Sequence, residues 1–235
     1  MSSQSNQQST IAIPRIIHRI WLGDRPMPEE YKQFGKTWQS LHPGWEMILW
    51  VDANLPPLKN TWAFNTASSL AARSNIARYE ILLRYGGIYV DTDFECLKNL
   101  EPLLENVECF VGWERDDIAN NAIIGAVPGH PFLCGLVDSL EENVRSMPDE
   151  DPAVTQSGPY YLTKMLHQHP EVTIFPPRLF YPYEWHERWR RNEKFPDAFA
   201  VHHWSMTWRE TRWSTEISPY SSVERRLCHL SRPSW

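Results

Sequence analysis

The segment from Arg73 to Glu95, RSNIARYEILLRYGGIYVDTDFE, most constrains how this 235-residue chain can fold. It predicts a helix that begins near Thr66 or Ser68, because hydroxyl side chains make good helix N-caps. The helix should end at Gly86-Gly87, since glycine best tolerates the left-handed conformation that closes a helix. A short apolar, β-prone run at 88–90 then predicts a strand, and two aspartates follow it directly.

One arginine of this helix falls on its apolar side. On a helical wheel the expected solvent face consists of Arg73, Ala77, Glu80 and Arg84. Asn75 and Arg78 lie in the opposite, apolar arc. A buried arginine needs an anionic partner, because an unpaired buried charge is very costly. That partner is more often a neighbouring acid of the protein, but the Asp-Thr-Asp that follows favours an external anion held beside a metal.

The two aspartates form a D-x-D triplet. Asp91 and Asp93 are two apart in a segment expected to be extended, which places both carboxylates on one side. Adjacent carboxylates repel each other, and a hard divalent cation relieves that repulsion, with phosphate oxygens and water completing its coordination. The triplet alone is common by chance, but the preceding strand and the inward arginine make the pattern more specific.

These residues resemble the sugar-binding DxD region of glycosyltransferase family 32, which is related to the glucosylating domain of the large clostridial cytotoxins. The resemblance extends to residues 13–23 (IPRIIHRIWLG), 155–163 (TQSGPYYLT) and 201–208 (VHHWSMTW), and so spans roughly residues 12–208. It implies an α/β fold of the GT-A type, with a mixed central sheet flanked by helices. It also implies a retaining transferase that uses Mn²⁺ or Mg²⁺ to move a hexose from a UDP- or GDP-sugar to a glycan or another hydroxyl acceptor.

The resemblance implies roles for individual side chains. The expected catalytic residues are Asp91, Asp93, Arg78 and Asn75. The residues expected to bind the nucleotide-sugar donor are Trp21, Arg78, Asp91 and Trp208. Trp21 stands where the family stacks the nucleotide base, whereas packing in the core is the ordinary role of such a tryptophan.

The expected third metal ligand lies in a strand near the end of the resemblance. His202 and Trp204 should face one way on this strand, and His203 and Ser205 the other. A lone histidine is more often structural than a ligand. In related transferases, however, a C-terminal residue completes the metal site, and Mn²⁺ accepts imidazole as well as carboxylate. We therefore expect His202, rather than His203, to join Asp91 and Asp93 on the metal.

The chain departs from the family in the helix motif, which usually reads Ser-Asp-x-x-Arg, with the Asp contacting the transferred sugar. Here Ser74 and Arg78 match, but Asn75 replaces the Asp. Asparagine can accept a hydrogen bond and also donates, and it brings no negative charge. The substitution bears on sugar preference and rate.

Composition excludes some classes of protein. The net charge of −6 argues against a nucleic-acid binder, which would show a basic face. The four cysteines lack zinc-site or CxxC spacing and fit a reducing compartment. Residues 1–10 read as a polar, disordered tail without the features of a signal peptide, and no apolar run approaches the ~20 residues of a membrane span. We expect a cytoplasmic protein with a single domain at 11–214 and a C-terminal tail at 215–235.

Strands alternate with helices along the chain, which indicates an α/β protein. The expected strands are 11–21, 47–51, 88–90, 109–113, 122–127, 172–175 and 198–204. The further expected helices are 28–42, 131–144 and 159–169, and residues 52–65 read as a loop. The aromatic and arginine-rich segment 176–197 is either a loop packed on the core or a lid over the sugar site.

Several polar residues between the expected strands 109–113 and 122–127 carry weaker signals. Asn120-Asn121 read as turn residues, although they could hold sugar hydroxyls. The nearby acids, Glu114, Asp116 and Asp117, read as a solvated loop, although an acceptor-activating carboxylate could be among them.

Two other functions remain open at this level. A haloacid-dehalogenase-like phosphatase also uses D-x-D after an apolar strand, with the first Asp as nucleophile, but there the motif normally lies near the N-terminus of the domain. A non-catalytic carbohydrate-binding protein with a structural Ca²⁺ would explain the many aromatic residues and Asn75. Nucleotide binding discriminates between these and a transferase.

Overall fold

A computed structural model describes residues 11–115, 117–148 and 150–205 of the chain. The expected tail at 1–10, Trp208 and the expected C-terminal tail at 215–235 lie outside these ranges. Within the described ranges, no helix is both long enough and apolar enough to cross a membrane.

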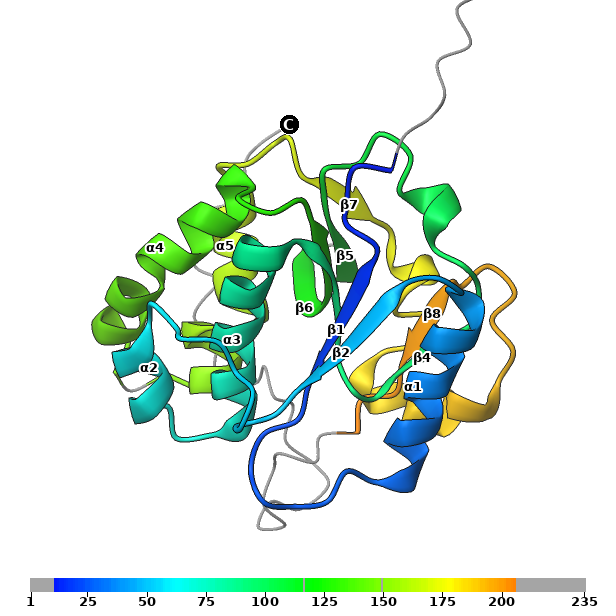
Figure 1. Ribbon diagram of the computed structural model, residues 1–235, viewed down its shortest axis with the longest axis horizontal. Coiled ribbons are helices and arrows are strands. Elements are labelled where there is room, and N and C mark those ends of the chain that lie inside the picture. Colours follow the sequence, from blue (N-terminus) through cyan, green and yellow to red (C-terminus); the bar gives the residue numbers. More distant parts are fainter. Residues whose placement is uncertain (1–10, 116, 149, 206–235) are drawn as a thin grey trace, which may run out of the picture. The chain divides into compact units, whose positions relative to one another are not determined.

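Helices and strands alternate as the sequence predicts (Figure 1). The strands are β1 Ile16–Ile20, β2 Glu46–Trp50, β3 Gly87–Val90, β4 Phe94–Cys96, β5 Cys109–Arg115, β6 Ile118–Ala126, β7 Thr173–Phe175 and β8 Ala200–His202. The α-helices are α1 Glu29–Leu41, α2 Thr61–Thr66, α3 Leu70–Tyr85, α4 Pro131–Ser146 and α5 Pro159–Leu166. Shorter helical turns are η1 Glu101–Leu103, η2 Pro152–Gln156, η3 Pro177–Leu179 and η4 Trp185–Asn192.

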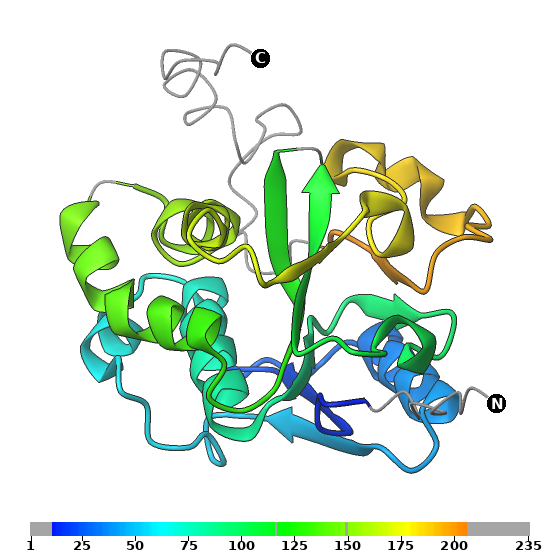
Figure 2. The same cartoon turned by 90° about the horizontal axis from the view of Figure 1, so that it is seen from above.

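Six strands form one mixed sheet in the order β2-β1-β3-β6-β5-β7. β1 is parallel to β2 and β3, β6 is antiparallel to β3 and β5, and β7 is parallel to β5. Helices α3, α4 and α5 cover one side of the sheet, and α1 lies on the other side with β4 and β8 (Figure 2). The predicted mixed sheet flanked by helices is confirmed.

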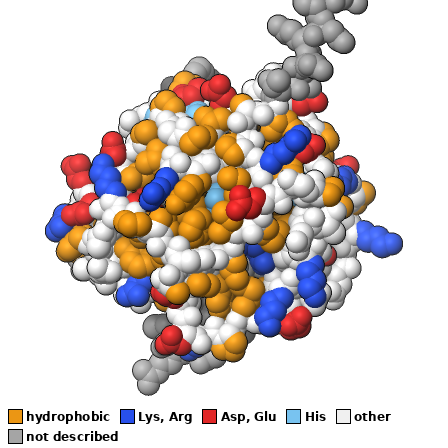
Figure 3. All heavy atoms as spheres, viewed as in Figure 1, with side chains coloured by type: hydrophobic (Ala, Val, Ile, Leu, Met, Phe, Trp, Pro, Cys, Tyr) orange, Lys and Arg blue, Asp and Glu red, His pale blue; other side chains and the backbone are white. Residues whose placement is uncertain are grey.

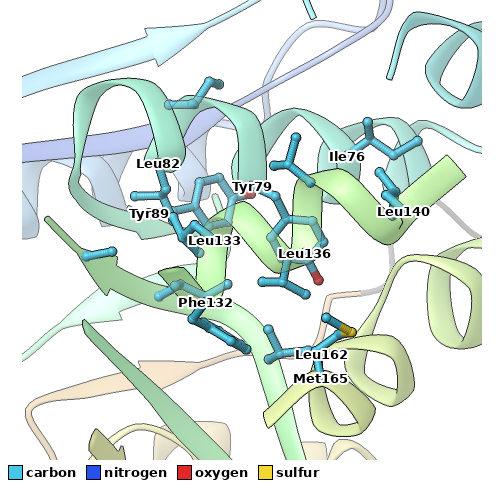
Figure 4. Close-up of a cluster of buried hydrophobic side chains, with 14 of the residues drawn as sticks. Ile76, Tyr79, Leu82, Tyr89, Phe132, Leu133, Leu136, Leu140, Leu162 and Met165 are labelled. Carbon is cyan, nitrogen blue, oxygen red and sulfur yellow. The ribbon is translucent and has the colours of Figure 1, made fainter. Parts of the chain in front are cut away.

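The larger apolar cluster lies between the sheet and the three helices on its first side. Tyr79 and Leu82 of α3 meet Leu133 and Leu136 of α4 there (Figure 4). The second cluster, on the side of α1, includes the aromatic residues Trp38, Phe94, Phe110, Phe180, Tyr181 and Tyr183. The aromatic segment 176–197 is therefore packed on the core by part of its aromatics, while Trp189 of η4 is 74% exposed.

Helix α3 ends where the sequence predicts and begins later. Gly86 closes it at φ +63°, and a Cβ there would lie 2.6 Å from Pro128 Cδ, so the position requires glycine. The N-cap is Ser69, whose hydroxyl accepts from the Ala72 N–H, and not Thr66 or Ser68. The expected start was wrong because Thr66 is the last residue of α2, a helix that begins inside the predicted loop 52–65 and ends one residue beyond it.

The expected solvent face of α3 is also wrong in part. Ala77 is fully buried and Glu80 is 8% exposed, because α2 and α4 pack against that face. The Glu80 carboxylate accepts the backbone N–H groups of Lys59, at 2.5 Å, and Asn60, at 2.7 Å. Glu80 thus fixes the loop that enters α2.

We expect Glu80→Ala to destabilise the protein by about 2–3 kcal/mol, because it leaves buried donors without their charged acceptor. Urea unfolding followed by far-UV circular dichroism measures the change. Arg84→Ala, an exposed site on the same helix, is the matched control and should change the free energy of unfolding little. Equal effects of the two substitutions would contradict this role of Glu80.

One face of the molecule mixes charged and apolar side chains. On the face shown in Figure 3, acidic and basic side chains are interspersed around a largely apolar centre, and the described residues form no basic stripe there.

Candidate functional site

Three side chains converge where β3 ends. Asp91, Asp93 and His202 each offer one ligand atom, and these atoms all lie within 4.8 Å of one another. His202 Nε2 is 3.2 Å from Asp93 Oδ1 and 3.9 Å from Asp91 Oδ2. The structure therefore brings together the three residues that the sequence predicts to hold a metal.

A small second sheet produces this meeting. β4 and β8 pair antiparallel, with Phe94 opposite His202 and Glu95 opposite Val201. The sequence analysis missed β4, which is three residues long and begins directly after the D-x-D triplet. His203 points away from the triplet side chains: its Nε2 is 3.0 Å from Glu95 Oε2, and its Nδ1 is 3.0 Å from the Tyr183 hydroxyl.

The two aspartates share a side for a different reason than predicted. Residues 91–93 are not extended but form a turn, in which the Phe94 N–H donates to the Asp91 carbonyl at 3.1 Å. The Asp91 N–H donates to Ala122 of β6, and the Asp93 carbonyl accepts from the His203 N–H. Backbone hydrogen bonds to β6 and to the end of β8 therefore hold the turn that presents both carboxylates.

Arg78 reaches this turn from α3 and pairs with a protein acid. Its Nη2 lies 3.1 Å from Asp91 Oδ1, and its Nη1 donates to the Asn121 carbonyl at 2.6 Å. The guanidinium also stacks on the Tyr89 ring at 4.3 Å and is 4% exposed. The Tyr89 hydroxyl donates to the same Asp91 Oδ1 at 2.6 Å. One oxygen of Asp91 is thus held by Arg78 and Tyr89, which leaves the other directed toward His202.

The charges of the cluster shift the pKa values of its members. Burial raises the pKa of Asp91 and outweighs the opposing Arg78, and the nearby Asp93 raises it further. Burial alone would lower the pKa of His202, but the carboxylates of Asp93 and Asp91 outweigh it and raise the pKa above its ordinary value. His202 Nδ1 is buried without a hydrogen-bond partner, so Nε2 is the ring atom that the site presents. The cluster favours bound positive charge, which suits a divalent cation.

These shifts predict how stability changes with pH in the absence of metal. A raised pKa means that folded His202 holds its proton more tightly than the unfolded chain does. Its contribution is complete below the unfolded value of about 6.5 and is lost as pH rises through the folded value. We expect the metal-free melting temperature to fall from pH 6.5 to 8.5, and the stabilisation by added Mn²⁺ to grow over the same range. Differential scanning fluorimetry with and without Mn²⁺ measures both; a Mn²⁺ effect that is largest at the lowest pH would contradict the assignment.

Asn75 lies in a buried network of polar groups beside Arg78. Its Nδ2 donates to the Ala153 carbonyl at 2.9 Å, and its Oδ1 accepts from Asn121 Nδ2 at 3.0 Å. The Tyr79 hydroxyl joins the same network by donating to the Ser157 carbonyl. An aspartate at position 75 could not donate to Ala153, so the surroundings are adapted to the amide.

Two expectations about the neighbouring polar residues are wrong. Asn120 and Asn121 are not turn residues but buried members of β6. Glu114 is 3% exposed and accepts from Asn120 Nδ2 at 2.7 Å, so it does not belong to a solvated loop. The nine-residue β6 and the seven-residue β5 both reach further than the sequence indicated. Asp117 is exposed as expected.

Trp21 follows β1 directly and belongs to neither apolar cluster. Its Nε1 donates to the Arg25 carbonyl at 2.7 Å, and its ring meets Tyr31 edge-on at 5.8 Å. The side chain is half-buried. Its expected contact with a nucleotide base stays a prediction.

Comparison with known proteins connects this geometry to an enzyme family. Residues 28–110 match the family described as "Glycosyltransferase sugar-binding region containing DXD motif". The chain is 35% identical over 213 residues to inositol phosphoceramide mannosyltransferase 3 of Schizosaccharomyces pombe, an alignment that covers 86% of this chain and 51% of that protein. The chain thus spans about half the length of the curated relatives that it matches.

Solved structures share the fold. The PaToxG glycosyltransferase superposes with a TM-score of 0.60 at 17% identity, covering 67% of this chain and 69% of that one. The catalytic domain of alpha-toxin from Clostridium novyi superposes with a TM-score of 0.50 at 12% identity, covering 69% and 65%. These matches confirm the GT-A fold and the resemblance, expected from the sequence, to family 32 and to the clostridial toxins.

Proposed function

We propose that this chain is a metal-dependent hexosyltransferase, because residues 28–110 match the glycosyltransferase sugar-binding regions that contain a DXD motif. It moves a hexose from a nucleoside diphosphate to a hydroxyl group of an acceptor. The observation that carries the proposal is the group formed by Asp91, Asp93 and His202. The phosphatase alternative has no support from the GT-A fold or from the family match.

The residues present fit a divalent cation such as Mn²⁺ or Mg²⁺. Two carboxylates and one imidazole are ligands that Mn²⁺ accepts, and diphosphate oxygens can complete its coordination. When bound, the cation supplies stabilisation of the negative charge that develops on the leaving diphosphate. Asp91 and Asp93 would hold it, and His202 would offer Nε2 beside them.

Arg78 acts mainly through Asp91 in this proposal. Its contacts to Asp91, Asn121 and Ser74 occupy most of its donors, and it is buried. Arg78 therefore positions the metal-binding carboxylate through a hydrogen bond between charged groups, which is a strong kind of contact. It also adds positive charge near the proposed position of the donor phosphates. Trp21 is proposed to stack on the base of the nucleotide, as flat aromatic faces do.

The relative's name suggests the sugar and the acceptor. That protein is a mannosyltransferase acting on inositol phosphoceramide, so mannose is the first candidate sugar and a polyol or glycan hydroxyl the first candidate acceptor. We also propose retention of anomeric configuration, which the family resemblance supports. The cytoplasmic location expected from the composition stays a prediction.

Nucleotide binding tests the proposal most directly. Calorimetric titrations with UDP and GDP, with and without Mn²⁺, should show binding of one nucleotide that tightens when Mn²⁺ is present. Incubation with GDP-mannose or UDP-glucose should then release the free nucleotide slowly, by transfer to water. A carbohydrate-binding protein would bind neither nucleotide, and that result would exclude a transferase.

A further inference from the structure

Arg19 is a buried cation at the base of the D-x-D turn. It belongs to β1, projects toward α1 and is 4% exposed. Its Nη2 donates to the Thr92 carbonyl at 2.6 Å and to the Tyr31 carbonyl at 2.8 Å. Among the described residues no carboxylate lies within ion-pair distance of it, and its Nε has no hydrogen-bond partner. A buried guanidinium that binds only carbonyl groups is unusual and calls for a physical explanation.

Helix α1 is shaped to admit this side chain. Gly35 lies within α1, and a Cβ at that position would be 2.2 Å from Arg19 Nη1. Glycine is a poor helix former, so its presence in the middle of α1 needs a reason. Because Gly35 has no side chain, the Arg19 guanidinium occupies the space that a Cβ would otherwise fill.

The backbone of the turn shows what Arg19 does. The Asp91 carbonyl accepts from Phe94, and the Asp93 carbonyl accepts from His203. The Thr92 carbonyl lies between them and is bound by Arg19. The three consecutive carbonyl groups of the triplet are thus each held by a different partner.

We propose that Arg19 is a positioning residue that locks the 91–93 turn in the shape that presents both carboxylates to a cation. The inference rests on the proposed function, because it concerns the same metal site. Burial lowers the pKa of Arg19 to about 10, and the fields of Tyr89, Asp93 and Asp91 oppose that shift. Arg19 therefore remains charged and also offsets the mutual repulsion of the two aspartates.

Position and charge predict opposite effects on metal binding. A fixed cation near the site repels Mn²⁺, so removing the charge alone would tighten Mn²⁺ binding. Removing the clamp on Thr92 would instead loosen the turn and weaken binding, and loss of such supporting contacts typically costs 10–100-fold in metal affinity. We expect Arg19→Met to raise the Mn²⁺ dissociation constant about 10-fold or more. Arg19→Lys, which keeps the charge but has a shorter side chain without the planar guanidinium, should also raise it.

Gly35→Ala supplies a second test that leaves Arg19 in place. Its methyl group displaces the guanidinium, so it should weaken Mn²⁺ binding, although alanine favours the helix. In the Arg19→Met background the same substitution should have little effect, because the side chain it displaces has gone. This non-additivity distinguishes the clamp from a general packing defect.

The measurement is Mn²⁺ binding by electron paramagnetic resonance, with the melting temperature of each variant recorded alongside. Wild-type Mn²⁺ affinity in both Arg19→Met and Gly35→Ala, or tighter binding in Arg19→Met, would overturn the inference. If Arg19→Met does not fold, Gly35→Ala and Arg19→Lys carry the test. Absence of Mn²⁺ and nucleotide binding in the wild-type protein would instead refute the proposed function.

Discussion

Asp93→Asn should lower kcat/KM for donor turnover by about 10³-fold or more while leaving the fold intact. The carboxylate is a proposed metal ligand, and a metal ion contributes several kcal/mol to such a reaction. Asparagine has nearly the same shape, and losing one of two adjacent carboxylates also removes their repulsion. Asp91→Asn should abolish turnover too but should also destabilise the protein, because it leaves the buried Arg78 without its anion, at a cost of about 3–5 kcal/mol.

Donor hydrolysis with Mn²⁺ and the melting temperature of each variant separate these outcomes. Asp117→Asn is the matched control, because that carboxylate is exposed on the turn between β5 and β6. Near-wild-type hydrolysis in both Asp91→Asn and Asp93→Asn would refute the metal site. A loss of activity in Asp93→Asn that merely follows a loss of folded protein would not support it.

The second large effect is expected at Arg78. Arg78→Met should destabilise the protein by about 3 kcal/mol, since it leaves the partly buried Asp91 carboxylate without its cation. Arg78→Lys keeps the charge but cannot bind Asp91, Asn121 and Ser74 together, so we expect a folded protein whose activity falls about 10–100-fold.

A double-mutant cycle isolates the pair. Arg78→Met combined with Asp91→Asn should be more stable than the sum of the two single losses predicts, because no buried charge is left unpaired. Urea unfolding measures the three variants. Strict additivity of the changes in the free energy of unfolding would show that Arg78 and Asp91 do not interact. Full activity in Arg78→Lys would mean that a single positive charge at this position is sufficient.

Local signals in the sequence were sufficient for the elements that lead to the site. The end of α3 depends on one backbone conformation, and the structure confirms that the helix ends at Gly86. The D-x-D triplet is a chemical pattern, and the structure places its two carboxylates close together. The face of α3 that carries Glu80 was misjudged, because a helical wheel does not reveal how many neighbours pack around a helix. β4 was missed because a three-residue strand depends on its partner, which lies about a hundred residues further along the chain.

Arg19 was missed for a similar reason. It lies in an isoleucine-rich strand, and a single sequence does not reveal which element the Arg19 side chain contacts. The glycine within α1 was the available clue, but its meaning depends on which strand the helix covers. Contacts between distant segments therefore account for most of what the sequence left undetermined.

Because β4 pairs with β8, the site can be completed only late in the synthesis of the chain. A ribosome that has delivered residues up to 175 has supplied every strand of the six-stranded sheet, yet the site still lacks His202. Only the docking of a three-residue strand brings the third ligand to the two aspartates. A ligand stabilises the state to which it binds. A cation bound by all three side chains would therefore stabilise the docked position of β8.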